Sequence, residues 1–438
     1  MLQDPSQRSY ALLSGFVFFF FFAQAAAISL LSIWLSQSLH LSGAAAGMVF
    51  SANFIAAMAS QPLYGYISDR MGFRRLVPAA TACLVTLAGP FFLWVYAPLL
   101  RFNLLAGAVV GGLYIGVTFV AGSYALEAYI NRISRRDGFE YSRVRLWGSL
   151  GFAAAAFVSG DLYNLNPNLN FFLASAAGLV LLPLIWGVRG SRDAMATGPA
   201  SDAPGDALRL ADAAGVLVDP KFWRLMVLIL GVTNLYLVYD LQFPHYFASM
   251  FATPARGNAM FGYLNSAQIF VEAGMMFVAP VIVRRTGAKN GLLIATAIMI
   301  VRIAGSGLAI GPLTISACKM LHSLELPILM VSIFRYIGFH FEQRLSATIY
   351  MVGISFGHSL GLALLSPVVG SLYDVIGFPH TYFIIAAFAA VFWTTSTFAL
   401  SPTPNEMPRG AVNEADRAKA NAAATPAKPA PAAPAPIH

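Results

Sequence analysis

Four ionisable residues lie in a part of the sequence that is otherwise almost wholly apolar. Arg302 interrupts the apolar run Gly291–Ile310, and Lys319, His322 and Glu325 follow in the next apolar segment at intervals of three residues. At about 100° per helical residue, the last three share a stripe of roughly 120°. A charge at the bilayer centre costs at least ~2.5–3.5 kcal/mol, so such groups are expected to pair and to face a wet interior.

This cluster predicts a proton pathway. His322 can exchange a proton near neutral pH. Glu325 lies between two leucines and should keep its proton while the site is dry, whereas the nearby Arg302 favours its release when water enters. The alternative is a static ion-pair network that clamps two helices. Two bases, a histidine and an acid together favour a function over that alternative.

A second pair of charges is found in the first half of the chain. Glu127 ends a long apolar run, and Arg145 opens the next one. A carboxylate and a guanidinium across a cavity can accept from and donate to sugar hydroxyls. Phe152 is seven residues beyond Arg145 on the same helical face and can offer its ring to a sugar. The alternatives are a helix-capping ion pair and ordinary packing of Phe152.

The second half adds two polar pairs with helical spacing. Tyr236 and Asp240 are four residues apart, and we expect Asp240 to form a mainly structural ion pair with Lys319. Gln268 and Glu272 have the same spacing in another apolar run, which suits a polyol ligand better than an ion.

Composition places the chain in a membrane. Of its 438 residues, 58% are hydrophobic and 11% are charged, whereas a soluble domain has about a quarter charged residues. The net charge of +8 indicates membrane topology rather than nucleic-acid binding, because the cations lie mostly in short loops. Cys83 and Cys318 lie in apolar runs, so neither a disulfide framework nor a cysteine metal site is expected.

Hydropathy predicts an all-α integral membrane protein with two bundles of six helices. Each predicted span is near the ~20 residues that cross a bilayer. A polar linker at 189–220 separates residues 1–188 from residues 221–400, and an Ala/Pro-rich tail at 401–438 is predicted to be disordered. The twelve spans are 11–36, 44–68, 76–98, 103–129, 144–163, 168–188, 221–246, 258–283, 290–309, 312–335, 344–372 and 379–400.

Loop charges predict the orientation. Arginine and lysine gather after the second, fourth and eighth spans, while the opposite loops hold little beyond Arg101 and Arg256. The positive-inside rule then puts both termini and the linker in the cytoplasm. The first apolar run, from Tyr10 to Trp34, is longer than a signal-peptide core, so no cleavage is expected.

The loop after the second span resembles the signature of the major facilitator superfamily. It reads Gly65-Tyr-Ile-Ser-Asp69-Arg70-Met-Gly72-Phe-Arg-Arg75, with Phe73 departing from the strict spacing. We expect Asp69, Arg70 and Gly72 to form a loop that takes part in conformational change. The superfamily places its substrate between two six-helix halves.

Longer motifs resemble the lactose permease family of oligosaccharide/proton symporters over residues 8–400. They include Glu127-Ala-Tyr-Ile and Lys319-Met-Leu-His322-Ser-Leu-Glu325-Leu-Pro327. The resemblance implies that Glu127 and Arg145 bind sugar. It also implies that Glu325 carries the proton beside Arg302, that His322 couples sugar to proton with Tyr236 nearby, and that the functional unit is a monomer.

Positions at which this sequence departs from the family narrow the choice of substrate. The family's tryptophan falls at Phe152, its sugar-contacting glutamate at Ile269, and one Asp–Lys pair at Leu237 and His358. The sucrose permease branch also has its glutamate at the position of Glu272 and a neutral residue at Leu237. We therefore expect a symporter for sucrose, with a galactoside such as lactose, melibiose or raffinose as the next choice.

Other functions receive less support. A proton-coupled antiporter that exports a drug-like molecule or sugar would use the same fold, but Glu127 and Arg145 would serve no purpose in it. The run Gly353-Ile-Ser355-Phe-Gly357 matches a hydrolase motif that requires a strand–turn–helix, yet it lies in a predicted span. We expect no enzyme, no metal and no cofactor besides the coupling proton. The expected location is a bacterial inner membrane, with lipid but no nucleic acid as a partner.

Overall fold

The protein is helical wherever its structure is described. The computed structural model describes residues 5–71, 76–188, 215, 217–341 and 349–402, and all regular elements in these ranges are helices. A helix satisfies its own backbone hydrogen bonds, which is what an apolar segment requires in a bilayer. Nine of the described helices are long and apolar enough to cross a membrane, and the bent pair Leu76–Thr86 and Ala88–Phe102 makes a tenth.

Two further spans complete the predicted twelve. Helix α9 (Tyr141–Leu165) has 25 residues, but Arg143, Arg145 and Asp161 lower its hydropathy. Helix α19 (Gly357–Ala399) has 43 residues and contains two spans that meet at Gly377, where φ is 78°. This left-handed backbone is readily adopted by glycine alone, so the sequence dictates the joint. The prediction of an all-α protein with twelve spans is confirmed.

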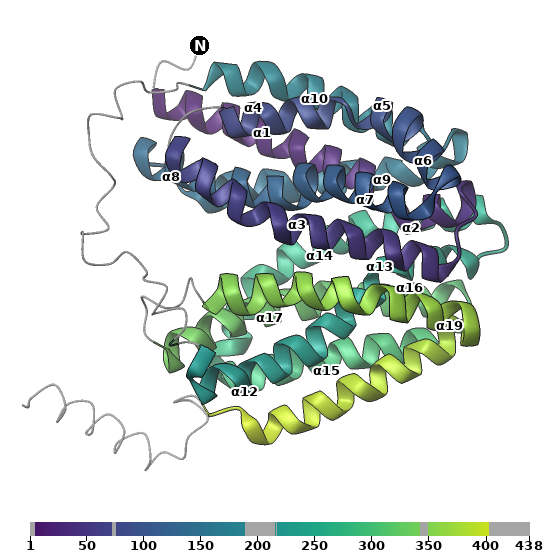
Figure 1. Ribbon diagram of the computed structural model, residues 1–438. Helices are drawn as coiled ribbons and strands as arrows, with labels where there is room; N and C mark the ends of the chain where they lie inside the picture. Colours follow the sequence, from purple (N-terminus) through teal and green to yellow (C-terminus); the bar gives the residue numbers. More distant parts are fainter. Residues whose placement is uncertain (1–4, 72–75, 189–214, 216, 342–348, 403–438) are drawn as a thin grey trace, which may run out of the picture.

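The N-terminal bundle contains six spans, several of them interrupted by a turn of π-helix. Figure 1 shows these helices together in one half of the molecule. Their elements are α1 (Pro5–Ile28), α2 (Leu31–Ile33), η1 (Trp34–Ser38), α3 (Gly43–Met71), α4 (Leu76–Thr86), α5 (Ala88–Pro90), η2 (Phe91–Tyr96), α6 (Ala97–Phe102), α7 (Leu104–Ile115), η3 (Gly116–Ala121), α8 (Gly122–Asp137), α9 and α10 (Leu169–Gly187).

The C-terminal bundle forms the other half in Figure 1. The predicted linker and tail lie almost entirely outside the described residues, so the exact domain boundaries stay a prediction. The elements of this bundle are α12 (Pro220–Leu228), η5 (Ile229–Thr233), α13 (Asn234–Ser249), α14 (Pro254–Thr286), α15 (Ala288–Gly307), α16 (Pro312–Met320), α17 (His322–His340), η7 (Ile349–Phe356) and α19.

Several of the described polar contacts between the bundles gather at one end, which we call the closed end. There the Asp374 carboxylate accepts hydrogen bonds from the backbone nitrogens of Gly43 (2.7 Å) and Ala44 (2.8 Å), and so caps α3 from the other bundle. The Gln242 amide donates to the Gly43 carbonyl at 3.0 Å. Asn258 exchanges hydrogen bonds with Gln37 in the same region.

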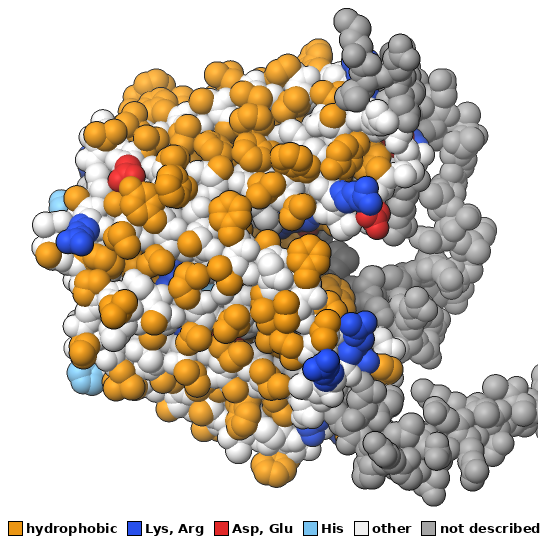
Figure 2. Space-filling model, turned by 180° about the vertical axis from the view of Figure 1, so that it is seen from behind, with side chains coloured by type: hydrophobic (Ala, Val, Ile, Leu, Met, Phe, Trp, Pro, Cys, Tyr) orange, Lys and Arg blue, Asp and Glu red, His pale blue; other side chains and the backbone are white. Residues whose placement is uncertain are grey.

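Glycines allow the helices to touch at the closed end. A Cβ on Gly160 would lie 2.2 Å from the Asn258 carbonyl oxygen, and one on Gly47 would lie 2.2 Å from that of Ser366. Any larger residue would therefore push the bundles apart. The opposite end is hollowed in Figure 2, and we call it the open end.

Candidate functional site

The centre of the C-terminal bundle holds a buried ion-pair network. Arg302 on α15 and Glu325 on α17 both have side chains that are fully buried, and Arg302 Nε lies 3.1 Å from Glu325 Oε1. Arg302 Nη2 also donates to Asp240 Oδ2 on α13 at 2.7 Å. One guanidinium therefore joins two carboxylates from two other spans, and the planar fork of arginine suits this role.

An aromatic and an imidazole group extend the network. His322 Nδ1 lies 3.0 Å from Glu325 Oε1 and is hydrogen-bonded to the Tyr236 hydroxyl. The Arg302 guanidinium lies over the Tyr236 ring at 4.7 Å. We call Asp240, Arg302, Glu325, His322 and Tyr236 the central cluster. Tyr236, His322 and Glu325 are joined through groups that can exchange a proton, whereas Arg302 can only donate hydrogen bonds.

One oxygen of the cluster is free to carry a proton. Glu325 Oε2 is buried and has no hydrogen-bond partner among the described residues. A buried carboxylate oxygen without a donor is unfavourable, whereas the same oxygen bearing a proton is neutral. Glu325 is thus the cluster's group best suited to alternate between charged and neutral forms.

The local helix geometry follows from the sequence around Glu325. A turn at Leu321 separates α16 from α17, so His322 is the first residue of the second helix. Pro327 lies inside α17 and lacks the N–H that would bond the Ser323 carbonyl. The backbone therefore departs from a regular helix on both sides of Glu325.

Lys319 attracts Asp240 electrostatically, but in the described structure its direct hydrogen bonds go to other residues rather than to the predicted partner. Its ammonium donates to Gln268 Oε1 at 2.6 Å and to Asn265 Oδ1 at 3.0 Å, both on α14. Among the described residues, the cation that binds Asp240 is Arg302. Spacing placed Lys319 in the stripe of His322 and Glu325, and its ammonium reaches from there to α14. Asn265 lies three residues before Gln268, and that spacing could have revealed it as a second acceptor.

The predicted sugar ligands of the second half lie beside this lysine. Gln268 is 3% exposed and Glu272 is partly buried one turn further along α14. Glu272 interacts electrostatically with Lys319 in its own bundle and with Arg145 in the other. Polar groups of the two bundles therefore approach one another at this depth.

Glu127 and Arg145 are brought together in the N-terminal bundle. Arg145 Nε donates to Glu127 Oε1 at 2.8 Å, and both side chains are about one-third exposed, with values of 37% and 31%. The ring beneath the guanidinium is Phe21, at 4.3 Å. Phe21 is 7% exposed and therefore packs inside the bundle. Phe152 is partly buried and packs against the core.

His358 has a neutral partner. Its Nε2 lies 2.7 Å from Thr233 Oγ1. Thr233 is one helical turn before Leu237, where the resemblance to the family places the acid of an ion pair. A hydroxyl–imidazole hydrogen bond thus replaces an ion pair between the same two spans.

The remaining predicted residues contribute no described chemistry. Gly72 and the side chains of Asp69 and Arg70 lie outside the described residues. Ser355 lies in the π-helix η7, not in a strand–turn–helix elbow. No group of residues suited to a metal ion occurs in the part of the chain that the structure describes.

Comparison with known proteins assigns the class. The fold is similar to that of the nucleoside transporter NupG, with a TM-score of 0.75, 16% identity, and coverage of 89% of this chain and 98% of the other. The family description "LacY proton/sugar symporter" matches residues 3–410. The chain belongs to this family, which is a family of permeases and has the twelve-helix major facilitator fold.

Curated relatives cover nearly the whole chain. The raffinose permease of Escherichia coli is 40% identical over 89% of this chain and 92% of its own length. The lactose permease of Klebsiella oxytoca is 38% identical over 86% and 91%. The sucrose permease of Escherichia coli is 34% identical over 90% and 94%.

Proposed function

We propose that this protein imports an oligosaccharide together with a proton by alternating access. The central cluster carries the proposal, because it buries an acid with a free oxygen against an arginine, a histidine and a tyrosine. Glu325 carries the proton, Arg302 assists its release, and His322 with Tyr236 links the proton to the sugar. Asp240 holds Arg302 in place.

The sugar would lie between the bundles. Glu127 and Arg145 would accept from and donate to its hydroxyls from one side, with Phe152 packing against a ring. From the other side, Gln268, Glu272 and His322 would complete the ligand set. The electrostatic interaction between Glu272 and Arg145 supports this arrangement, because it spans the two halves.

The substrate we propose is sucrose or an oligosaccharide that contains it. Overall identity is higher to the raffinose permease than to the sucrose permease, but the acid at Glu272 and the neutral residue at Leu237 favour the sucrose branch. Raffinose contains a sucrose unit. The overall identity and the two residues therefore both favour a substrate that contains sucrose.

The topology completes the proposal. The loop arginines and lysines support an orientation in which both termini, the linker and the open end face the cytoplasm of an inner membrane. The structure then corresponds to an inward-open state. The bundles would be residues 1–188 and 221–400, and one chain would be the functional unit.

Sugar-driven proton movement tests the function. De-energised cells in lightly buffered medium receive sucrose, raffinose, melibiose or lactose while the external pH is recorded. We expect alkalinisation with sucrose or raffinose, and none in cells without the protein. An acid shift on sugar addition would indicate antiport, and no shift with any of these sugars despite confirmed expression would reject symport of them.

A further inference from the structure

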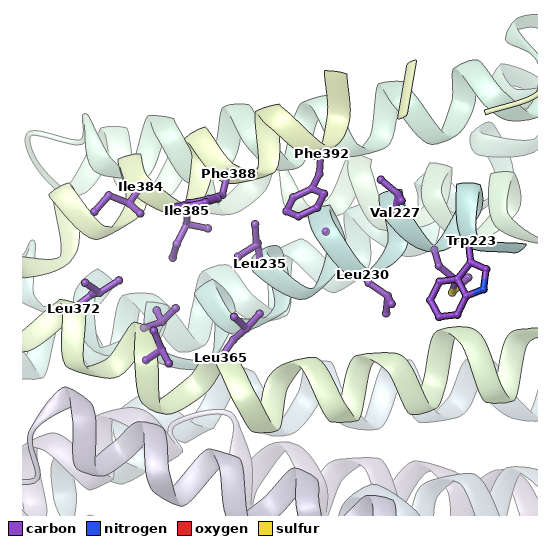
Figure 3. A pocket seen from close by; sticks show the side chains of 14 residues that line it. Trp223, Val227, Leu230, Leu235, Leu365, Leu372, Ile384, Ile385, Phe388 and Phe392 are labelled. Atoms are coloured by element: carbon purple, nitrogen blue, oxygen red, sulfur yellow. The ribbon is translucent and has the colours of Figure 1, made fainter. Parts of the chain in front are cut away.

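The C-terminal bundle has an apolar groove that is separate from the central cluster. It encloses about 500 Å³ between the span of α12, η5 and α13 and the two spans of α19. Figure 3 shows its lining side chains from Trp223 at one end to Leu372 at the other. All lining residues are apolar or aromatic apart from Gly231, so the groove offers nothing for a sugar to bind.

The groove is open to the outside of the bundle. Val368 and Phe388 line it and are 57% and 59% exposed, and Trp223 is 50% exposed. Large apolar side chains with that exposure on a membrane-spanning bundle face lipid. We propose that the groove binds one acyl chain of an anionic phospholipid from the bilayer leaflet at the open end.

The length of the groove fits this occupant. Its wall from Trp223 to Leu235 advances by twelve residue steps, or roughly 18 Å at the ~1.5 Å rise of a helix. One leaflet contributes about half of the ~30 Å hydrocarbon core. The groove thus extends from the membrane surface to about the bilayer centre, as one chain of one leaflet does.

Charge at the surface end selects the headgroup. Lys221 and Arg224 flank Trp223 in the sequence, and both are exposed. Asp219 is occupied as the cap of α12, because its Oδ1 accepts the Lys221 backbone N–H at 2.8 Å. The Trp223 indole donates to the Leu217 carbonyl at 2.7 Å, which fixes the ring at the mouth. Aromatic rings and cations at this depth bind headgroups near the membrane surface.

Native mass spectrometry of the purified full chain tests the site. With equal amounts of phosphatidylglycerol and phosphatidylcholine, we expect one retained phosphatidylglycerol per protein. Val368→Trp should lower that retention at least tenfold by filling the groove. The matched control is Val375→Trp, which makes the same change on the same span at a 79% exposed residue outside the lining.

The headgroup is tested separately. Lys221→Gln with Arg224→Gln should abolish the preference for phosphatidylglycerol, while size-exclusion profiles confirm that the variants remain folded. Equal retention of both lipids by the unmodified protein would overturn the proposal. So would equal retention by Val368→Trp and Val375→Trp.

Discussion

Glu325 offers the most direct test of the proposed coupling between sugar and proton. Its carboxyl is fully buried, lies 3.1 Å from Arg302 Nε and has one oxygen without a described partner. Glu325→Ala removes the group that would carry the proton but leaves the predicted sugar ligands in place. We expect at least a tenfold loss of sugar accumulation, while exchange of labelled for unlabelled sugar across the membrane persists.

The control for Glu325 is Glu140→Ala, because Glu140 is 69% exposed and pairs only with the surface residue Arg143 in the described structure. That variant should accumulate sugar normally. If Glu325→Ala instead lost exchange and expression together, Glu325 would be a structural member of an ion-pair network and the coupling role would fail.

Asp240 is the residue at which this structure departs from the predicted pairing. It is hydrogen-bonded to Arg302, whereas Lys319 is bound to Gln268 and Asn265. In double-mutant cycles, residues in direct contact couple by roughly 0.5–3 kcal/mol and separated ones by little. We therefore expect Asp240→Asn to couple more strongly with Arg302→Met than with Lys319→Met. The measurement is the free energy of unfolding of each purified single and double variant. A larger coupling with Lys319 would restore the predicted pair.

At the scale of helices, Gly160 determines how closely α9 approaches α14. A Cβ there would lie 2.2 Å from the Asn258 carbonyl oxygen, so Gly160→Leu cannot be accommodated without separating the helices. We expect the closed end to open and uptake to fall at least tenfold. Ser36 lies between the bundles at this end, since its Oγ is 3.3 Å from His245 Nε2. Ser36→Cys, combined with Cys83→Ser and Cys318→Ser, should then react faster with a maleimide.

Gly274→Leu makes the same change on α14, where a Cβ would meet nothing within 4 Å. It should leave both uptake and the labelling rate unchanged. Equal labelling of the cysteine in the Gly160 variant and in this control would show that the contact does not hold the closed end.

The sequence predicts the positions of the helices better than it predicts which side chains contact one another. Apolar length predicts most of the twelve spans because a bilayer requires a minimum apolar length, whereas α9 carries three charged residues and the last two spans are separated at Gly377. The spacing of Lys319, His322 and Glu325 correctly predicted that His322 and Glu325 lie together, since the two are in contact. It could not show that Lys319 would reach Gln268 and Asn265 on α14, nor which of several cations Asp240 would bind. Those choices depend on the packing of three helices that are far apart in the sequence.

At the scale of the whole molecule, the two ends should move in opposite directions during transport. Contacts such as Asp374 with Gly43 and Asn258 with Gln37 close one end, while the other is hollowed. Two rigid bundles that close around a sugar at one end must separate at the other. Spin labels can follow both ends at once in a background of Cys83→Ser and Cys318→Ser.

Cysteines replacing Glu140 and Phe339 would report the open end, because the two residues lie in loops or helix ends of different bundles and are exposed. Cysteines replacing Arg101 and Arg256 would report the closed end in the same way. We expect saturating sucrose to shorten the first distance and lengthen the second in double electron–electron resonance. A shortening at the open end without a change at the closed end would instead indicate a local gate. Rigid rotation of the bundles requires both changes, because each bundle carries a label position at each end.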